Sequence, residues 1–193
     1  MKIIKYFTLA AMLLPATQVL AFDDNREGFI LGLGAGLHGI KNDYRLNDIS
    51  YLTESRSGLA SSFKMGAGIS DQFTLYFVHN ASRFRTPVTI GASSKEATAV
   101  LFMDGIGASY FFETQSPSAY IHAGLGGSVF TYPNESDAAT RRGGAFMLGG
   151  GYEFDRHLMF EVTLLETRVS DPDNASYKTQ SSALQFTLNY MFY

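Results

Sequence analysis

Apolar and polar residues alternate along eight segments of the chain, and this pattern constrains the fold more than any other feature. Successive side chains of a β-strand point to opposite faces, so a period of two predicts a strand with one apolar face. Each segment is about ten residues long, a common strand length. The predicted strands are approximately Gly28–Gly39, Gly58–Ile69, Phe73–Ser82, Ala97–Phe112, Ala119–Phe130, Gly143–Phe154, His157–Glu166 and Ser182–Phe192.

Short and long connections alternate strictly between these segments. Three connections are short turns, at 70–72, 113–118 and 155–156, and the others are long and polar. In a closed antiparallel barrel every second connection lies at the same end, so the long connections share one end and the short turns the other. The sequence therefore predicts an all-β fold, an eight-stranded antiparallel up-and-down β-barrel. Its long loops include residues 42–56 and 82–96.

The first 21 residues have the composition of an export signal. Lys2 and Lys5 form a basic start, residues 7–14 are apolar, and the small residue Ala21 ends a site suited to cleavage. We therefore expect a cleaved signal peptide at 1–21 and a β-barrel domain at 22–193. The chain has no cysteine, so this exported domain must fold without disulfides.

The apolar faces of the strands end in aromatic residues. After Ala21 no run approaches the roughly 20 apolar residues that a membrane helix needs. A soluble ligand-binding barrel would show the same alternation with its apolar face inward, and it is the alternative. Aromatic girdles at both ends of an apolar band are typical of a transmembrane barrel. The expected girdle residues are Phe73, Phe111, Phe112, Tyr152, Phe154, Phe160, Tyr190 and Phe192 near the short turns, and Phe77, Phe102, Phe130 and Tyr132 near the long loops.

Three stretches carry a resemblance to a known family. They are the terminal LQFTLNYMFY, the GGGYEF run at 149–154 and the YIHAGLGG run at 120–127. Over residues 22–193 the chain resembles the small eight-stranded outer-membrane β-barrel proteins of Gram-negative bacteria, the outer-membrane protein A and X type. That resemblance implies a monomeric barrel in the cell outer membrane, with periplasmic termini and four external loops.

The same resemblance implies partners and a role. The partners are outer-membrane lipids and lipopolysaccharide, periplasmic chaperones and the barrel-assembly machinery. That machinery reads an alternating last strand, which here is Phe186, Leu188, Tyr190 and Phe192, with Tyr193 following the in-phase aromatic. The implied function is structural: stabilising the envelope and presenting surface loops, without catalysis. The sequence does not name a ligand for the loops.

Few charged residues fall within the strands. By parity Lys64, Glu153 and Glu161 project into the lumen, where buried charges require partners. We expect them to form a polar network that plugs the barrel, and a minor small-solute channel is the alternative. The sequence leaves open whether Asp104 faces inward or outward, because it shares its parity with Phe102 and Ile106.

A second set of residues near the long-loop end allows an enzymatic alternative. A nucleophilic serine needs a histidine base, and His79 and Ser82 close the third strand, with His38 and Glu166 near the same end. This end would face the outer leaflet, so the alternative is a lipid A-modifying enzyme of the deacylase or acyltransferase class. However, His79 falls in phase with the apolar Phe77, and polar interfacial residues without chemistry are the preferred interpretation.

Cofactor, metal and nucleic-acid sites are not expected. Residues 34–39 match the G-x-G-x-x-G pattern but lie within a strand instead of between a strand and a helix. His122 and His157 are isolated, so they form no metal-ligand cluster. The formal charge is −3, which gives no footprint for nucleic acid. Arginines of the outer loops, Arg83 and Arg85 among them, suit contacts with lipopolysaccharide phosphates.

Overall fold

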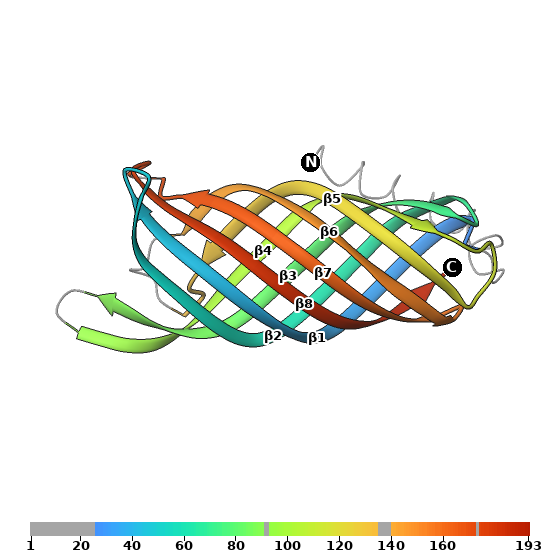
Figure 1. The fold of residues 1–193 in the computed structure, drawn as a ribbon, viewed down its shortest axis with the longest axis horizontal. Coiled ribbons are helices and arrows are strands. Elements are labelled where there is room, and N and C mark those ends of the chain that lie inside the picture. The colour runs from blue at the N-terminus through green and yellow to red at the C-terminus, as the bar shows by residue number, and fades with distance from the viewer. Residues whose placement is uncertain (1–25, 91–92, 135–139, 173) are drawn as a thin grey trace, which may run out of the picture.

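The computed structural model describes residues 26–90, 93–134, 140–172 and 174–193. Eight antiparallel strands form a closed barrel in sequence order, and pairing of the first strand with the last closes the ring (Figure 1). The all-β, eight-stranded prediction is confirmed. The strands are β1 (Gly28–Leu46), β2 (Ile49–Ser70), β3 (Phe73–Ile90), β4 (Ser93–Phe111), β5 (Ser118–Thr131), β6 (Arg141–Asp155), β7 (Leu158–Ser170) and β8 (Tyr177–Phe192).

The ranges named above contain no helix of the length and apolarity that a membrane span requires. The expected signal peptide at 1–21 lies outside the described residues.

The strand ends agree with the prediction at the short turns but not at the opposite end. The expected long loop at 42–56 is wrong, because β1 and β2 stay paired up to a two-residue turn at Asn47 and Asp48. Both turn residues have left-handed backbone angles, with φ of 50° and 64°, as a tight hairpin turn requires. Asn and Asp tolerate this conformation better than most residues. The pairing continues because backbone hydrogen bonds need no apolar face. The alternation that marks a strand in the sequence ends here, because the outward residues Lys41, Asp43 and Arg45 are polar.

The β3–β4 hairpin repeats this extension. Residues 82–96, expected as a loop, are mostly paired strand that continues to Ile90 and Ser93. Figure 1 shows the hairpin projecting past the other strands and turning away from β2. The barrel therefore carries two long hairpins at one end and short turns at the other.

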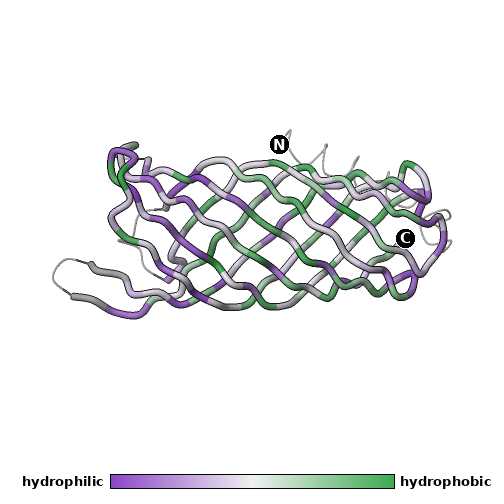
Figure 2. Tube along the Cα trace, viewed as in Figure 1, coloured by the Kyte–Doolittle hydropathy of each residue, from purple (hydrophilic) through white to green (hydrophobic). Residues whose placement is uncertain are grey.

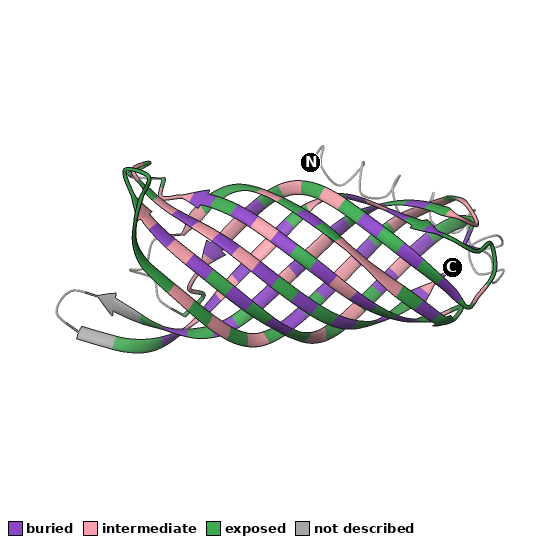
Figure 3. Cartoon of the chain, in the orientation of Figure 1, coloured by how far each residue is buried: buried purple, intermediate pink, exposed green. Residues whose placement is uncertain are grey.

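Side chains alternate between the lumen and the outside along every strand (Figure 3). On β8 Leu184, Phe186, Leu188 and Tyr190 are exposed on the outside, while Gln185, Thr187 and Asn189 are buried inside. Large exposed apolar residues recur on all eight strands, and in Figure 2 hydrophobic positions alternate with more polar ones along the barrel wall. An exterior of this kind requires an apolar solvent, which excludes the soluble barrel.

Three residues of the expected aromatic girdles face the lumen instead. Phe111 and Phe130 are buried inside, and Tyr132 packs against the same core cluster. Adjacent residues of a strand point to opposite faces, so Phe111 and Phe112 cannot both face outward. Only Phe112 is exposed. On β5 the even-numbered residues point inward, so Phe130 shares its face with Tyr120 and His122.

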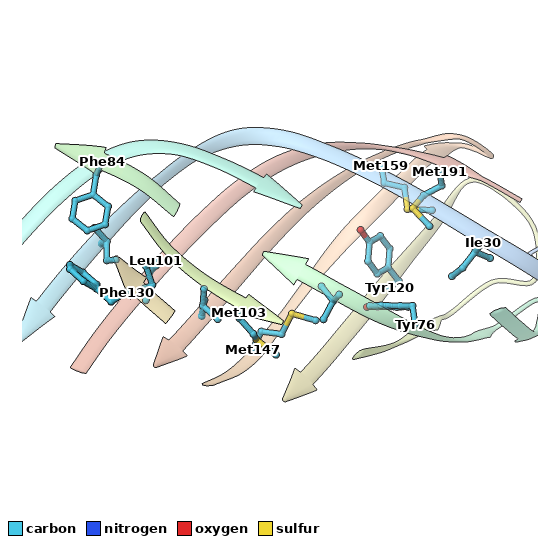
Figure 4. Close-up of a cluster of buried hydrophobic side chains, with 14 of the residues drawn as sticks. Ile30, Tyr76, Phe84, Leu101, Met103, Tyr120, Phe130, Met147, Met159 and Met191 are labelled. Atoms are coloured by element: carbon cyan, nitrogen blue, oxygen red, sulfur yellow. The ribbon is translucent and has the colours of Figure 1, made fainter. Parts of the chain in front are cut away.

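The interior apolar residues gather near both ends of the lumen, with methionines between them (Figure 4). Phe84, Leu101 and Phe130 lie near one end, and Met103 and Met147 fill the middle. Met159, Met191, Ile30, Tyr76 and Tyr120 lie toward the other end. Polar side chains occupy the remaining interior positions, and these carry the candidate sites.

Candidate functional site

One polar cluster crosses the lumen between β2 and β7. The Lys64 ammonium donates to the Glu161 carboxylate, and both side chains are buried. Tyr120 donates to the same carboxylate over 2.9 Å, and Thr163 over 3.1 Å. His122 Nδ1 lies 3.4 Å from Glu161. The Glu161 charge is therefore matched by a cation and by hydroxyl donors, as a buried carboxylate requires.

A second cluster closes the short-turn end. Arg26 pairs with Glu153, and it also donates to the backbone oxygens of Asp71 at 2.7 Å and Glu113 at 2.8 Å. The Tyr193 hydroxyl donates to Glu153 over 3.2 Å. Arg26 thus ties two of the short turns to β6. Lys64 and Glu161 were expected to share one network with Glu153, but Glu153 belongs to this separate cluster.

Hydrogen bonds also join inward side chains of different strands nearer the long hairpins. Ser62 donates to Asn189, Gln185 donates to Ser82 over 2.9 Å, and Ser181 donates to Asn42 over 2.7 Å. All six side chains are buried. Gln185 on β8 and Ser82 on β3 lie three strands apart, so their hydrogen bond crosses the lumen. Asn42 and Ser181 lie on paired strands, and Ser62 and Asn189 lie on the two strands that flank β1.

A tyrosine pair lies at the loop-end mouth, beyond the apolar band. Burial raises the pKa of Tyr44 above its ordinary value, and burial also raises the pKa of Tyr132, its hydrogen-bond partner. The Arg141 guanidinium lies 5.8 Å from the Tyr44 ring and donates to Thr179 over 2.6 Å. The tyrosines stay protonated at neutral pH, so each hydroxyl remains a donor.

The residues of the enzymatic alternative are not brought together. His79 lies on the outer face, where its Nδ1 is 2.7 Å from Asp104 Oδ1, whereas Ser82 is buried in the lumen. His38 points inward to the Arg83 backbone oxygen at 3.3 Å, and Glu166 accepts from Ser182. Opposite faces of one strand cannot supply a serine and its base, so this arrangement forms no Ser–His pair.

Asp104 faces outward, which the sequence did not decide. Its side chain is 47% exposed and that of His79 is 37% exposed, and the Phe102 ring lies 5.5 Å from the His79 ring. Asp104 lies at alternate positions with Phe102 and Ile106, and this alternation was the sequence feature that could indicate its direction. Asp104 faces outward, as these two residues do. The structure thereby places a polar pair, which sequence reasoning missed, within the outward apolar band.

The alternating residues of the expected assembly signal lie on the outside of β8. Phe186, Leu188 and Tyr190 are exposed and Phe192 is partly exposed, while Tyr193 turns into the lumen and is 1% exposed. Among residues 26–90, 93–134, 140–172 and 174–193 no group of three or more His, Cys, Asp or Glu side chains is placed to hold a metal ion.

Comparisons with known proteins identify the family. A family model described as the outer membrane protein beta-barrel domain matches residues 7–192. No curated protein matches the chain. Among solved structures, Neisserial surface protein A is similar at 17% identity, with a TM-score of 0.55 over 84% of this chain and 96% of that chain.

The attachment invasion locus protein Ail of Yersinia pestis shares the same barrel. It matches at 10% identity, with a TM-score of 0.52 over 84% of this chain and 98% of that chain. At these identities the likeness concerns the fold. Since the family model covers nearly the whole chain and the fold agrees with it, the chain belongs to the outer membrane protein beta-barrel family and is an integral protein of the outer membrane.

Proposed function

We propose that the protein is a structural barrel that fills its own lumen and presents its two long hairpins for contacts at the cell surface, without catalysis. The observation that carries this proposal is the contrast between the two ends. The short-turn end is held together by the Arg26–Glu153 cluster, whereas β1–β2 extends to a turn at Asn47 and Asp48.

The β1–β2 hairpin carries exposed apolar residues at its tip, separated from the apolar band by Lys41 and Asp43. We call these residues the hairpin-tip patch: Leu46 is 37% exposed, Ile49 72%, Tyr51 56%, Leu52 47% and Tyr177, on the neighbouring strand β8, 38%. Exposed aromatic and aliphatic side chains clustered on a water-facing surface are typical of protein contact sites. The patch therefore supports an external protein as the partner class.

The test compares cells that display the wild-type protein with cells that display an Ile49→Ser/Leu52→Ser variant. We expect wild-type cells to bind at least one of a panel of immobilised extracellular proteins, and the variant to lose most of that binding. Leu33→Ser, which changes a 54%-exposed residue inside the apolar band, is the matched control for loss of an exposed leucine. Equal binding by all three cell types would contradict a contact role for the tip.

Two further measurements address the channel and the enzyme. In planar bilayers we expect no steady ion-selective conductance, because the Lys64–Glu161 pair and the Gln185–Ser82 hydrogen bond cross the lumen and the Arg26–Glu153 cluster closes its short-turn end. Expression should leave the acyl pattern of lipid A unchanged in mass spectra, since His79 and Ser82 lie on opposite faces of β3. A deacylated or newly acylated species that vanishes with His79→Ala would restore the enzymatic alternative.

A further inference from the structure

The two long hairpins part from each other on one side of the barrel. β2 and β3 remain paired from Ser70 and Phe73 up to Gly58 and Phe84. A Cβ at Gly58 would lie 2.0 Å from the Arg83 backbone oxygen, so the two strands approach closely at the last pair. Beyond it β2 continues only with β1, and β3 only with β4. This separation leaves a notch of about 690 Å³ between the hairpins.

Two arginines that have no side-chain partner among the described residues line the notch. Arg83 and Arg85 lie on the same outer face of β3, and both are exposed. Within the part of the chain that the structure describes, neither guanidinium makes a hydrogen bond or an ion pair from its side chain. Arg56, which also lines the notch, is paired with Glu54 at 3.3 Å. Two uncommitted guanidinium groups side by side suit an anion that accepts several hydrogen bonds.

The rest of the notch lining adds neutral donors and one acid. Ser55, Ser57 and Thr98 supply hydroxyl groups, and the only carboxylate in the lining is that of Glu96. No ion pair joins Glu96 to either arginine in the described residues. The outer part of the notch therefore keeps a net positive charge.

A smaller groove continues from the notch into the apolar band. Its volume is about 310 Å³, and Leu59 and Arg83 line both spaces. Three small residues form its floor in one row across the sheet, since Ala35 pairs with Ser61 and Ser61 with Ala81. Large side chains flank this row along β2. Phe63 is the next outward residue toward the short turns, and Leu59 is the next outward residue toward the notch. Small side chains between large ones thus leave a groove on the outer face of the sheet, lined by Ala35, Ala60 and Ala81 among others.

The order of these features along the strands matches one class of ligand. Cations lie outermost and the apolar groove lies on the membrane side, so an occupant needs an anionic headgroup above an acyl chain. We propose that this face of β1, β2 and β3 binds lipopolysaccharide, the phosphorylated glycolipid of the outer leaflet. Arg83 and Arg85 hold a phosphate of lipid A, and one acyl chain lies over Ala35, Ser61 and Ala81. This site is independent of the hairpin-tip patch.

The headgroup half of the site is tested with the full mature protein refolded in detergent. Native mass spectrometry counts the molecules of diphosphorylated lipid A retained by each barrel. We expect one retained lipid A for the wild type and a loss of affinity of about tenfold or more for Arg83→Gln/Arg85→Gln. Arg142→Gln/Arg168→Gln removes the same charge from β6 and β7, on the opposite side of the ring, and should bind as the wild type does. An equal loss in both double variants would overturn the proposal.

The acyl half is tested separately, so that a folding failure of the arginine variant leaves a second measurement. Ala81→Leu fills the groove and should weaken lipid A binding, while Ala123→Leu, at an exposed position on β5, should not. Each variant must first keep the compact band that shifts on boiling. Equal binding of dephosphorylated lipid A or of phosphatidylglycerol, or unchanged binding by Ala81→Leu, would overturn the assigned ligand.

Discussion

At the scale of single residues, the lumen depends on pairing charges that water no longer solvates. Lys64 and Glu161 are both buried, and they are joined directly and surrounded by the hydroxyl donors Tyr120 and Thr163. Burial of either charge alone is costly, while the pair together is close to neutral relative to a well-packed apolar pair. The pair therefore specifies how β2 and β7 face each other more than it adds free energy.

Glu161→Gln should destabilise the folded barrel by about 3–5 kcal/mol, because Lys64 then stays buried without a counter-charge. The double variant Lys64→Met/Glu161→Met should recover most of the loss. Reversible urea unfolding in lipid vesicles, followed by the heat-modifiable band, measures both. If the double variant is as unstable as Glu161→Gln, the unpaired charge of Lys64 is not the cause of the lost stability.

At the scale of elements, the β1–β2 hairpin shows how a turn extends strands beyond the apolar band. Asn47 and Asp48 both adopt left-handed angles, and the Asn47 amide donates to the Ser176 backbone oxygen over 3.1 Å. Lys178 on β8 donates to Asp48 at 2.9 Å, so the hairpin tip is tied to the neighbouring strand. The tip is therefore held by backbone geometry and by contacts from β8.

Asn47→Ala should lower the free energy of unfolding by about 1 kcal/mol, since alanine pays more than asparagine for the left-handed angle. Asn47→Gly should be neutral or stabilising, because glycine adopts that angle without strain. Urea unfolding of the two variants in parallel decides between them. If glycine and alanine destabilise equally, the asparagine side chain, and not the turn geometry, is what matters.

The Asp48 carboxylate should titrate below its ordinary pKa of 3.8, because Lys178 donates a hydrogen bond to it and lies close as a positive charge. A lowered folded-state pKa means that the contribution of the pair to stability is complete above the ordinary pKa and is lost as pH falls through the lower folded value. Side-chain carboxyl chemical shifts across a pH titration measure this pKa. Lys178→Met should return it toward the ordinary value, and an unchanged titration would contradict the pairing.

At the scale of the whole molecule, the barrel is polarised along its axis. The short turns lie at one end with the Arg26–Glu153 cluster, and the long hairpins lie at the other. Figure 1 shows that the C-terminus lies at the short-turn end. We therefore expect the hairpins to lie outside the cell and the short turns in the periplasm, as bacterial barrels of this type are oriented.

The absence of cysteine makes this orientation directly testable. Ile49→Cys should react with a membrane-impermeant maleimide on intact cells, because that side chain is 72% exposed at the hairpin tip. Gln115→Cys, in the turn between β4 and β5, should react only after the outer membrane is permeabilised. Labelling of Gln115→Cys on intact cells would reverse the orientation.

Alternation made most of the barrel predictable, because one face of each membrane-crossing strand meets lipid and the other meets the lumen. It placed the eight strands and the three short turns, and the inward parity of Lys64, Glu153 and Glu161 agrees with their burial. It failed beyond the apolar band, where residues 42–46 and 49–56 are strand although their outward side chains are mostly polar. Backbone hydrogen bonds hold these strands together without requiring a hydrophobic pattern in the sequence. The only sequence signal for the hairpin is therefore the Asn47–Asp48 pair, whose residue types suit a tight turn.

By itself, then, the sequence determined the strand count, the barrel topology and which side chains face inward, because these follow from local periodicity and connection length. Only the tertiary structure decided which inward charges meet, since the partners of Glu153 include Arg26 and Tyr193, far away in the chain. It also decided where β2 and β3 separate, and so brought Arg83 and Arg85 beside the groove at Ala35, Ser61 and Ala81. Such sites depend on the register between strands, which is fixed by the packing of the closed ring and not by any one segment.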